Sequence, residues 1–188
     1  MQNRIISNLD SLIDNEKPHF LLAVSGGIDS MVLLNFFHKN RESYRFSVAH
    51  INHNYHSDAK KMEHLVKDQC AQMNNDLIIE NIFLKGVNSN IESNFRKMRY
   101  GKLEEIRKKI KADFILTAHH ADDQVETILM KIINSSGLDG LQGLRKSNQN
   151  IIRPMHNISK NEISDYASLN SVKYIDDPTN SDNTFTRN

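Results

Sequence analysis

Two polar segments of this sequence combine residue types and spacings that could support a reaction. The first, Ser25-Gly-Gly-Ile-Asp-Ser30, lies between an apolar stretch and a second apolar stretch with helical spacing. Gly26 and Gly27 allow a tight turn whose backbone N–H groups can face an anion, and the dipole of the following helix adds positive potential there. Ser25 and Ser30 add hydroxyl donors, but the lysine of a Walker loop is missing. The pattern favours a phosphate loop over a plain strand-to-helix turn.

Asp29 is the unexpected member of this loop, because a carboxylate repels a phosphate unless a cation such as Mg²⁺ lies between them. The alternative is that Asp29 caps the helix, which the pattern predicts to begin at Asp29 or Ser30. A magnesium ion and a helix cap are therefore two competing explanations for this side chain.

The second segment, Thr117-Ala-His-His-Ala-Asp-Asp-Gln-Val-Glu126, predicts a helix whose first turns carry ionisable groups. At ~100° per residue, His119, Asp123 and Glu126 lie on one face of this helix. Together they could bind a metal or a cationic substrate. The alternative explanation is that Asp122 and Asp123, in the first turn, only stabilise the positive end of the helix dipole. No cysteine ligand lies nearby, so a structural zinc site is disfavoured.

Strand-like and helix-like stretches alternate along the chain and must position these two segments. We predict strands at Phe20–Val24, Arg45–His50, Leu77–Phe83 and Phe114–Ala118, with a weaker one near Asn150–Arg153. We predict helices at Asp29–Lys39, Asp58–Met73, Ile91–Lys109, Ala121–Asn134 and Lys160–Leu169. Capping-box patterns at Ser89–Glu92 and Ser159–Glu162 mark two helix starts. An apolar stripe on the fourth helix predicts a buried face made of Val125, Ile128, Leu129, Ile132 and Ile133.

This alternation predicts an α/β fold, namely a doubly wound, mainly parallel, Rossmann-like sheet of about five strands with helices on both faces. In such sheets the ligand binds beyond the carboxyl ends of the strands. Residues 25–30, His50 and His119 follow or end predicted strands, so we expect them to converge on one crevice. We expect a single domain, with a core at 1–155 and a helical extension at 156–188.

The composition excludes several classes of protein. With 24 basic and 23 acidic residues, overall charge does not direct the chain to nucleic acid, although local patches stay open. Cys70 is the sole cysteine, which excludes a disulfide framework, and its apolar neighbours predict a buried, unreactive thiol. No apolar run approaches membrane-spanning length and the first residues lack a signal-peptide pattern, so we expect a cytoplasmic protein with no membrane partner.

The loop SGGIDS resembles the SGGxDS signature of the PP-loop ATP pyrophosphatases, which split ATP between its α and β phosphates. The resemblance implies that the pyrophosphate part of ATP is held by Ser25, Gly26, Gly27, Ile28, Asp29 and Ser30. It also implies that Mg²⁺ neutralises this group, and Asp29 is then better explained by the metal, reached through the phosphates, than by capping. No loop lysine is required, because the loop holds the leaving group.

The segment TAHHADDQVETILM resembles the TAHHADDQAET segment of bacterial tRNA(Ile)-lysidine synthetases, which are PP-loop enzymes. Six further segments of this chain resemble elements of that family: Val48–His53, Asn90–Tyr100, Ser136–Gly143, Ile152–Pro154, Asp176–Ser181 and Arg187–Asn188. The resemblance implies that ATP adenylates C2 of the wobble cytidine in an isoleucine tRNA with a CAU anticodon. Pyrophosphate is released, and an amine of free L-lysine then attacks C2 as AMP leaves.

The same resemblance implies roles for individual side chains. Asp123 and Glu126 would bind the lysine amines, and His119 would orient an amine or accept its proton. Arg99 would be the cation that stabilises the negative charge that builds up during the reaction. The implied catalytic set is Asp29, Arg99, His119, Asp123 and Glu126.

Other positions carry weaker implications. Arg96 and Gly137 would contact tRNA, although a solvated basic face is the alternative for Arg96. His50 would lie near the adenine or ribose. The family usually has Arg-Gly-Ser-Gly where this chain has Asn134-Ser-Ser-Gly137, which puts the contact of that loop in doubt. Asn54 stands where glycine is common, a mild change because asparagine tolerates positive φ.

Members of this family continue into further domains that grip the tRNA. We therefore expect this chain to be the N-terminal catalytic part, which binds ATP yet modifies tRNA poorly. The sequence leaves open whether the chain forms a homodimer.

Two rival functions stay open. The first is another adenylating PP-loop enzyme such as a tRNA thiolase, which a lone Cys70 disfavours. The second is a non-catalytic nucleotide-binding module, which would need neither Arg99 nor the ionisable helix face. The spacing of His50, His53 and His56 also invites a metal, but a loop role is favoured for His53 and His56.

Overall fold

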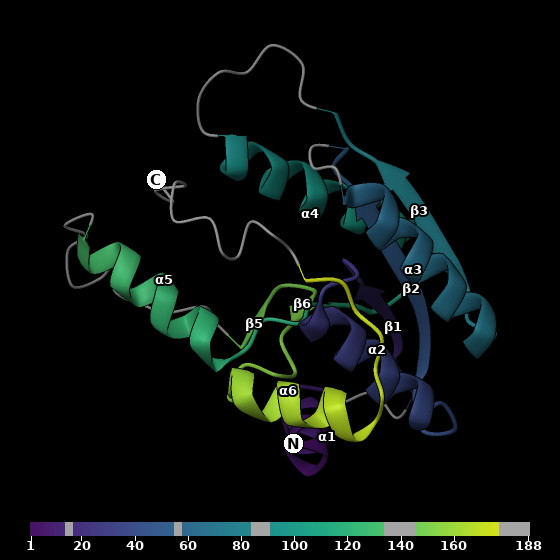
Figure 1. Ribbon diagram of the computed structural model, residues 1–188, viewed down its shortest axis with the longest axis horizontal. Helices are drawn as coiled ribbons and strands as arrows, with labels where there is room; N and C mark the ends of the chain where they lie inside the picture. Colours follow the sequence, from purple (N-terminus) through teal and green to yellow (C-terminus); the bar gives the residue numbers. More distant parts are fainter. Residues whose placement is uncertain (14–16, 55–57, 84–90, 134–145, 177–188) are drawn as a thin grey trace.

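The computed structural model describes residues 1–13, 17–54, 58–83, 91–133 and 146–176. A sheet of six strands has the order β3-β2-β1-β4-β6-β5 (Figure 1). The strands are β1 His19–Ala23, β2 Arg45–Asn52, β3 Leu77–Asn81, β4 Phe114–Leu116, β5 Ser147–Asn148 and β6 Ile151–Ile152. All neighbouring strands are parallel except β5 and β6. The doubly wound, mainly parallel sheet predicted from the sequence is confirmed.

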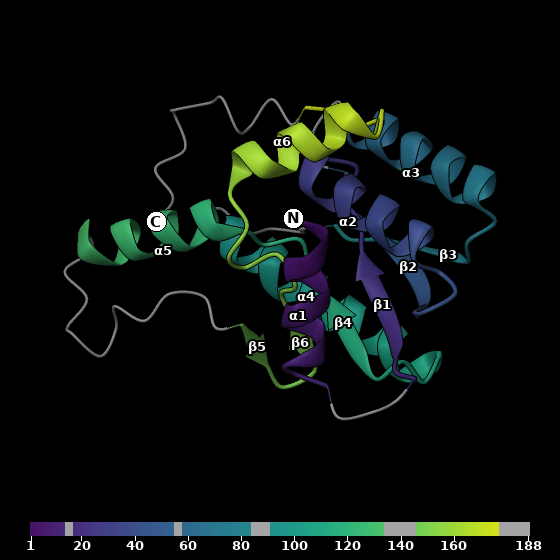
Figure 2. The ribbon, with the colours of Figure 1, turned by 90° about the horizontal axis from the view of Figure 1, so that it is seen from below.

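Helices cover both faces of the sheet. They are α1 Gln2–Asp10, α2 Ile28–Lys39, α3 Ala59–Met73, α4 Ile91–Lys109, α5 Ala121–Ile133 and α6 Lys160–Leu169. Buried side chains of α1, α2, α3 and α6 share one apolar cluster, and α4 packs in a second cluster on the other face. Figure 2 shows α2, α3 and α6 together on one side of the strands.

The strand β1 shows why its sequence is an unbroken apolar run. Phe20 and Leu22 belong to the α2-side cluster, whereas Leu21 belongs to the α4-side cluster. Since successive side chains of a strand point to opposite faces, a strand covered on both faces must be apolar at every position. Two elements were not predicted: α1, and the two-residue strand β5, which is too short to show a periodicity.

The prediction that the apolar stripe of α5 is buried is wrong. Val125, Leu129, Ile132 and Ile133 are 56%, 53%, 55% and 73% exposed, and no residue of α5 is buried. In both views α5 extends away from the sheet (Figures 1 and 2). Periodicity identifies the apolar face of a helix, but only the packing decides whether another element covers it, and no described element covers most of this face.

The exposed stripe predicts an unusual tolerance to mutation. Leu129→Gln should change the free energy of unfolding by no more than about 0.5 kcal/mol, because little apolar surface is buried there. Leu33→Ala, at a residue that is 0% exposed, should cost about 2–5 kcal/mol. Urea unfolding of the two variants and the wild type checks both values, and a Leu129→Gln loss as large as that of Leu33→Ala would contradict the exposed position.

Three local predictions are confirmed. Cys70 is buried in the α2-side cluster, and burial raises the pKa of its thiol to about 11. Asn54 has φ +52°. The capping box of α6 is formed, with the Ser159 hydroxyl accepting from the Glu162 N–H and the Glu162 carboxylate accepting from the Ser159 N–H. The pattern that begins at Ser89 lies outside the described residues.

Candidate functional site

A cavity of about 240 Å³ opens at the carboxyl ends of β1 and β4. The strand β1 lies between β2 and β4, so consecutive connections run in opposite directions from this point. This is the switch point at which doubly wound sheets bind ligands. Six of the predicted site residues line the cavity: Ser25, Asp29, Ser30, Arg99, His119 and Asp123. An apolar part of the wall is formed by Ala23, Ala49, Ile51 and Leu103.

The glycine pair shapes the loop, and the two glycines are not equivalent. Gly26 has φ +100°, and a Cβ there would lie 2.9 Å from the Met62 Cβ of α3. Gly27 has φ −76° and ψ 161° and is the N-cap of α2. The helix α2 therefore begins at Ile28, ahead of the predicted start at Asp29 or Ser30.

The hydroxyl group of Ser30 organises the loop from within. It accepts N–H bonds from Ser25 and Gly26 at 3.1 and 3.2 Å and donates to the Gly27 carbonyl at 2.9 Å. The Gly27 N–H in turn donates to the Ser25 hydroxyl at 3.4 Å. These bonds direct the N–H groups of Ser25 and Gly26 to the Ser30 oxygen and that of Gly27 to the Ser25 oxygen, so the two serine hydroxyls set the shape of the ligand-free loop.

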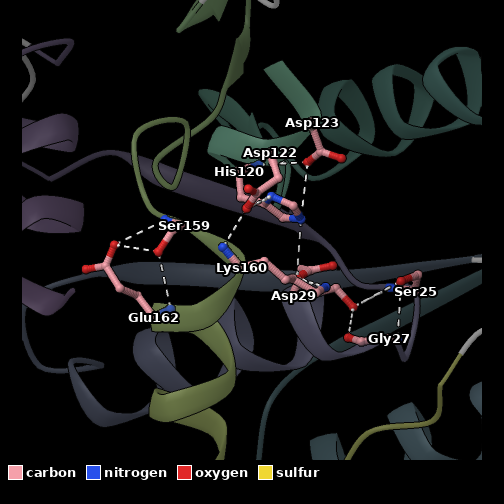
Figure 3. Close-up of polar contacts among 10 residues, drawn as sticks. Ser25, Gly27, Asp29, His120, Asp122, Asp123, Ser159, Lys160 and Glu162 are labelled. Carbon is pink, nitrogen blue, oxygen red and sulfur yellow. Dashed lines mark hydrogen bonds and ion pairs between the residues drawn. The ribbon is translucent and has the colours of Figure 1, made fainter. Parts of the chain in front are cut away.

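Asp29 does not cap α2, so the capping explanation is wrong. Its carboxylate Oδ1 lies 2.5 Å from the Lys160 Nζ and 3.6 Å from the His120 Nε2 (Figure 3). Both partners come from distant parts of the chain, α6 and the segment before α5. The side chain is 28% exposed and lines the cavity, where it is accessible to a ligand.

The helix α4 supplies the cationic wall. Arg99 lines the cavity, as does Tyr100. The guanidinium groups of Arg96 and Arg99 each lie 5.6 Å from the centre of the Tyr100 ring, a cation–π arrangement. Arg96 is exposed and does not line the cavity, so only one of the two arginines faces the site.

His119 lines the cavity close to several arginine side chains. Its Nδ1 lies 2.8 Å from the Thr117 hydroxyl. Burial lowers the pKa of its imidazole to about 3, with further lowering by Arg153, Arg96, Arg99 and His120. The ring is therefore neutral at physiological pH and is a weak proton acceptor in the ligand-free protein. Arg153, which is 5% exposed, is a buried charge that the sequence analysis did not assign to the site.

The pKa of His119 predicts a contribution to acid lability. Below pH 6.5, the ordinary histidine value, the unfolded chain takes up a proton here while the folded chain stays neutral down to about pH 3. The contribution of His119 to the free energy of unfolding is thus complete above pH 6.5. It falls by up to about 1.4 kcal/mol per pH unit as the pH drops from 6.5 toward about 3. Urea unfolding from neutral to mildly acidic pH should show a flatter dependence for His119→Asn. An NMR titration of His119 near its ordinary pKa would contradict the prediction.

The start of α5 places a second histidine among carboxylates. The His120 N–H donates to Asp123 Oδ2 at 2.8 Å, and its Nε2 lies 3.6 Å from the same oxygen. The His120 Nδ1 lies 3.5 Å from Asp122 Oδ2. His120, with a side chain that is 10% exposed, was not among the predicted site residues. Glu126, further along α5, is half-buried and does not line the cavity.

His50 and His53 have different positions. His50 is 3% exposed, and its Nδ1 donates to the Val24 carbonyl at 2.8 Å, where it supports the end of β1 rather than the cavity lining. Burial lowers the pKa of its imidazole. His53 lines the cavity, and its ring meets the Phe95 ring edge-on at 5.2 Å. Within the described segments, no group of three His, Cys, Asp or Glu side chains is arranged to hold a metal.

Gly137 with its loop, His56, and the stretch 177–188 that carries the last resembled motifs lie outside the described residues. Along the described segments, no helix is both long enough and apolar enough to cross a bilayer.

The fold and the cavity together define an α/β protein with an anion-binding loop at the switch point of a parallel sheet. The whole chain, residues 1–188, matches the family described as PP-loop domain. The chain belongs to this family.

Relatives at moderate identity are lysidine synthases. The tRNA(Ile)-lysidine synthase of Thermosipho africanus is 35% identical over 179 residues, which cover 92% of this chain and 42% of the relative. That of Borreliella afzelii is 38% identical over 180 residues, covering 92% of this chain and 41% of the relative. The chain thus spans about two fifths of the length of these curated relatives.

Solved structures share the fold at low identity. A U34-tRNA thiolase from Methanococcus maripaludis has a TM-score of 0.79 at 17% identity and covers 93% of this chain and 64% of that chain. An NH3-dependent NAD synthetase from Campylobacter jejuni has a TM-score of 0.60 at 12% identity and covers 91% of this chain and 72% of that chain. At these identities the likeness concerns the fold alone.

Proposed function

We propose that this chain is the ATP-activating part of a tRNA(Ile)-lysidine synthase. The observation that carries the proposal is the convergence of three distant segments on one cavity: the PP-loop, Arg99 of α4, and the His119 and Asp123 pair at the start of α5. The similarity to lysidine synthases supports the choice among PP-loop activities.

In this proposal, ATP binds with its β and γ phosphates on the loop at residues 25–30. The backbone amides and the positive end of α2 hold the anion, and Arg99 faces it from α4. Asp29 on the cavity lining fits a Mg²⁺ ion held mostly by phosphate oxygens, the usual manner in which proteins bind this ion with nucleotides. Bound there, the ion would neutralise charge on the departing pyrophosphate.

The remaining substrates are L-lysine and an isoleucine tRNA with a CAU anticodon. Asp123 lines the cavity and offers a carboxylate to a lysine amine, and Glu126 would join it when substrate is present. Arg96, exposed beside the cavity wall, would contact the tRNA phosphates. Release of pyrophosphate and then of AMP would leave lysine joined to C2 of the wobble cytidine, and the remaining domains of a full-length enzyme would hold the tRNA.

The proposal is tested by transfer of labelled lysine to tRNA. The chain is joined to the C-terminal part of a lysidine synthase relative and supplied with ATP, magnesium and the CAU-anticodon isoleucine tRNA. We expect label in the tRNA, with AMP and pyrophosphate released in proportion. AMP release that depends on a sulfur donor would support a thiolase instead, although Cys70, the only cysteine, is 1% exposed. No lysine transfer by a folded protein that binds ATP would refute the proposal.

Asp123 provides a test of the amine site. Asp123→Asn should lower lysine transfer by about 30-fold, because the lysine amine would lose a hydrogen bond to a charged group, which contributes about 2 kcal/mol. The affinity for ATP, measured by calorimetry, should stay within about threefold, since the loop amides are untouched. A non-catalytic nucleotide-binding module would show no dependence of its output on Asp123.

A further inference from the structure

Lys160 places a positive charge beside the PP-loop from a distant part of the chain. Its Nζ lies 2.5 Å from Asp29 Oδ1, although 131 residues separate the two in sequence (Figure 3). Asp29 lines the cavity, and the Lys160 side chain is 40% exposed. The ammonium group is therefore at the margin of the cavity, next to the loop that lacks a lysine of its own.

The backbone of Lys160 is held in place by several contacts. Its N–H donates to Asp122 Oδ2 at 2.6 Å, and the Ala121 N–H donates to the Ile158 carbonyl at 2.9 Å. The capping box of Ser159 closes the first turn of α6 (Figure 3). Further along, Ile163 packs in the α2-side cluster. The first two contacts fix the start of α6 beside the start of α5, and Ile163 packs α6 into the cluster that it shares with α2, while the four-carbon side chain of Lys160 keeps its freedom to turn.

The negative charges of Asp29 and of a bound pyrophosphate would repel each other unless a cation lies beside the loop. A pyrophosphate group held at residues 25–30 would face the carboxylate of Asp29, and the loop itself contains no basic residue. Arg99 reaches the cavity from α4, on a different element. Two basic side chains in the described part of the chain reach the Asp29 carboxylate, and the Lys160 Nζ at 2.5 Å is within hydrogen-bond distance whereas the His120 Nε2 lies at 3.6 Å, so Lys160 is positioned to offset this repulsion.

We propose that Lys160 supplies, from α6, the cation that the PP-loop lacks. It neutralises Asp29 in the ligand-free protein, and it turns to a phosphate oxygen of the bound nucleotide when Asp29 faces the metal. This inference rests on the proposed use of ATP at the loop. It makes Lys160 a binding residue for the pyrophosphate group, beyond any role in attaching α6 to α2.

The test uses calorimetry to measure the affinities of Lys160→Met, Lys160→Arg and the wild-type chain for MgATP, inorganic pyrophosphate and adenosine. Lys160→Met should weaken binding of MgATP and of inorganic pyrophosphate by about tenfold or more, the worth of a hydrogen bond to a charged group. Adenosine, which has no phosphate, should bind within about twofold of the wild type, and Lys160→Arg should recover most of the lost affinity. Lys39→Met is the matched control, because Lys39 contacts Asn170 between the same helices away from the loop.

The outcomes separate this inference from the proposed function. Unchanged MgATP and pyrophosphate binding in Lys160→Met would overturn the inference and leave the function standing. An equal loss for adenosine, with no recovery in Lys160→Arg, would show that Lys160 only anchors α6 and would also overturn it. A wild-type chain that binds neither MgATP nor pyrophosphate would refute the proposed function and this inference together. Thermal unfolding of each variant verifies that it is folded.

Discussion

Replacing Arg99 by alanine should lower the rate of tRNA adenylation by about 100- to 1000-fold, the usual cost of losing one charge-stabilising donor. The reason is that negative charge builds on phosphate oxygens in the cavity, and Arg99 is the arginine of α4 that lines it. The measurement is AMP formation by the protein completed with its tRNA-binding domains, at saturating ATP. Binding of ATP should weaken much less than the rate.

Arg96→Ala is the matched control for this experiment. Arg96 lies on the same helix and at the same 5.6 Å from the centre of the Tyr100 ring, but it is exposed and does not line the cavity. Its loss should mainly raise the KM for tRNA, as expected for a phosphate contact. Equal losses of rate in the two variants would contradict the distinct role of Arg99.

Replacing Gly26 by alanine should destabilise the protein by about 2–4 kcal/mol and remove most of its affinity for ATP. At φ +100° an alanine is strained, and its Cβ would lie 2.9 Å from the Met62 Cβ and 3.2 Å from the Met62 Cα. Both the loop and α3 would have to move, so the amides around the Ser30 hydroxyl would lose their arrangement. Urea unfolding and calorimetry with MgATP measure the two effects.

Gly27→Ala is the control for the effect on stability. Gly27 has an ordinary φ of −76°, and a Cβ there would meet only the Ser25 hydroxyl at 3.6 Å. The free energy of unfolding should therefore fall only by about 0.5–1 kcal/mol, the usual preference for glycine over alanine at an N-cap. A loss as large as that of Gly26→Ala would show that the strain at Gly26 is not the cause.

The elements that carry a clear local sequence signal, such as a helical periodicity, a cap or a glycine pair, were predicted well. The helices at Ile91–Lys109 and Lys160–Leu169 have the bounds expected from their periodicity and caps. The loop after β1 was recognised because a glycine pair between two apolar runs has few other uses. The convergence of Ser25 and His119 also followed, since the rule that ligands bind at strand ends depends only on the order of elements, whereas Arg99 was assigned to the site from the family resemblance.

The tertiary structure decided what the local pattern could not contain. Asp29 meets Lys160 because α6 packs beside α2, and it meets His120 because β4 pairs with β1; no local signal links residues so far apart in the chain. Among the described residues, no element covers most of the apolar stripe of α5. The sequence by itself thus determined the sheet, the PP-loop and the residue types at the site. The partners of each charge, and the burial of each apolar face, depended on long-range packing, because both are properties of neighbours in space rather than along the chain.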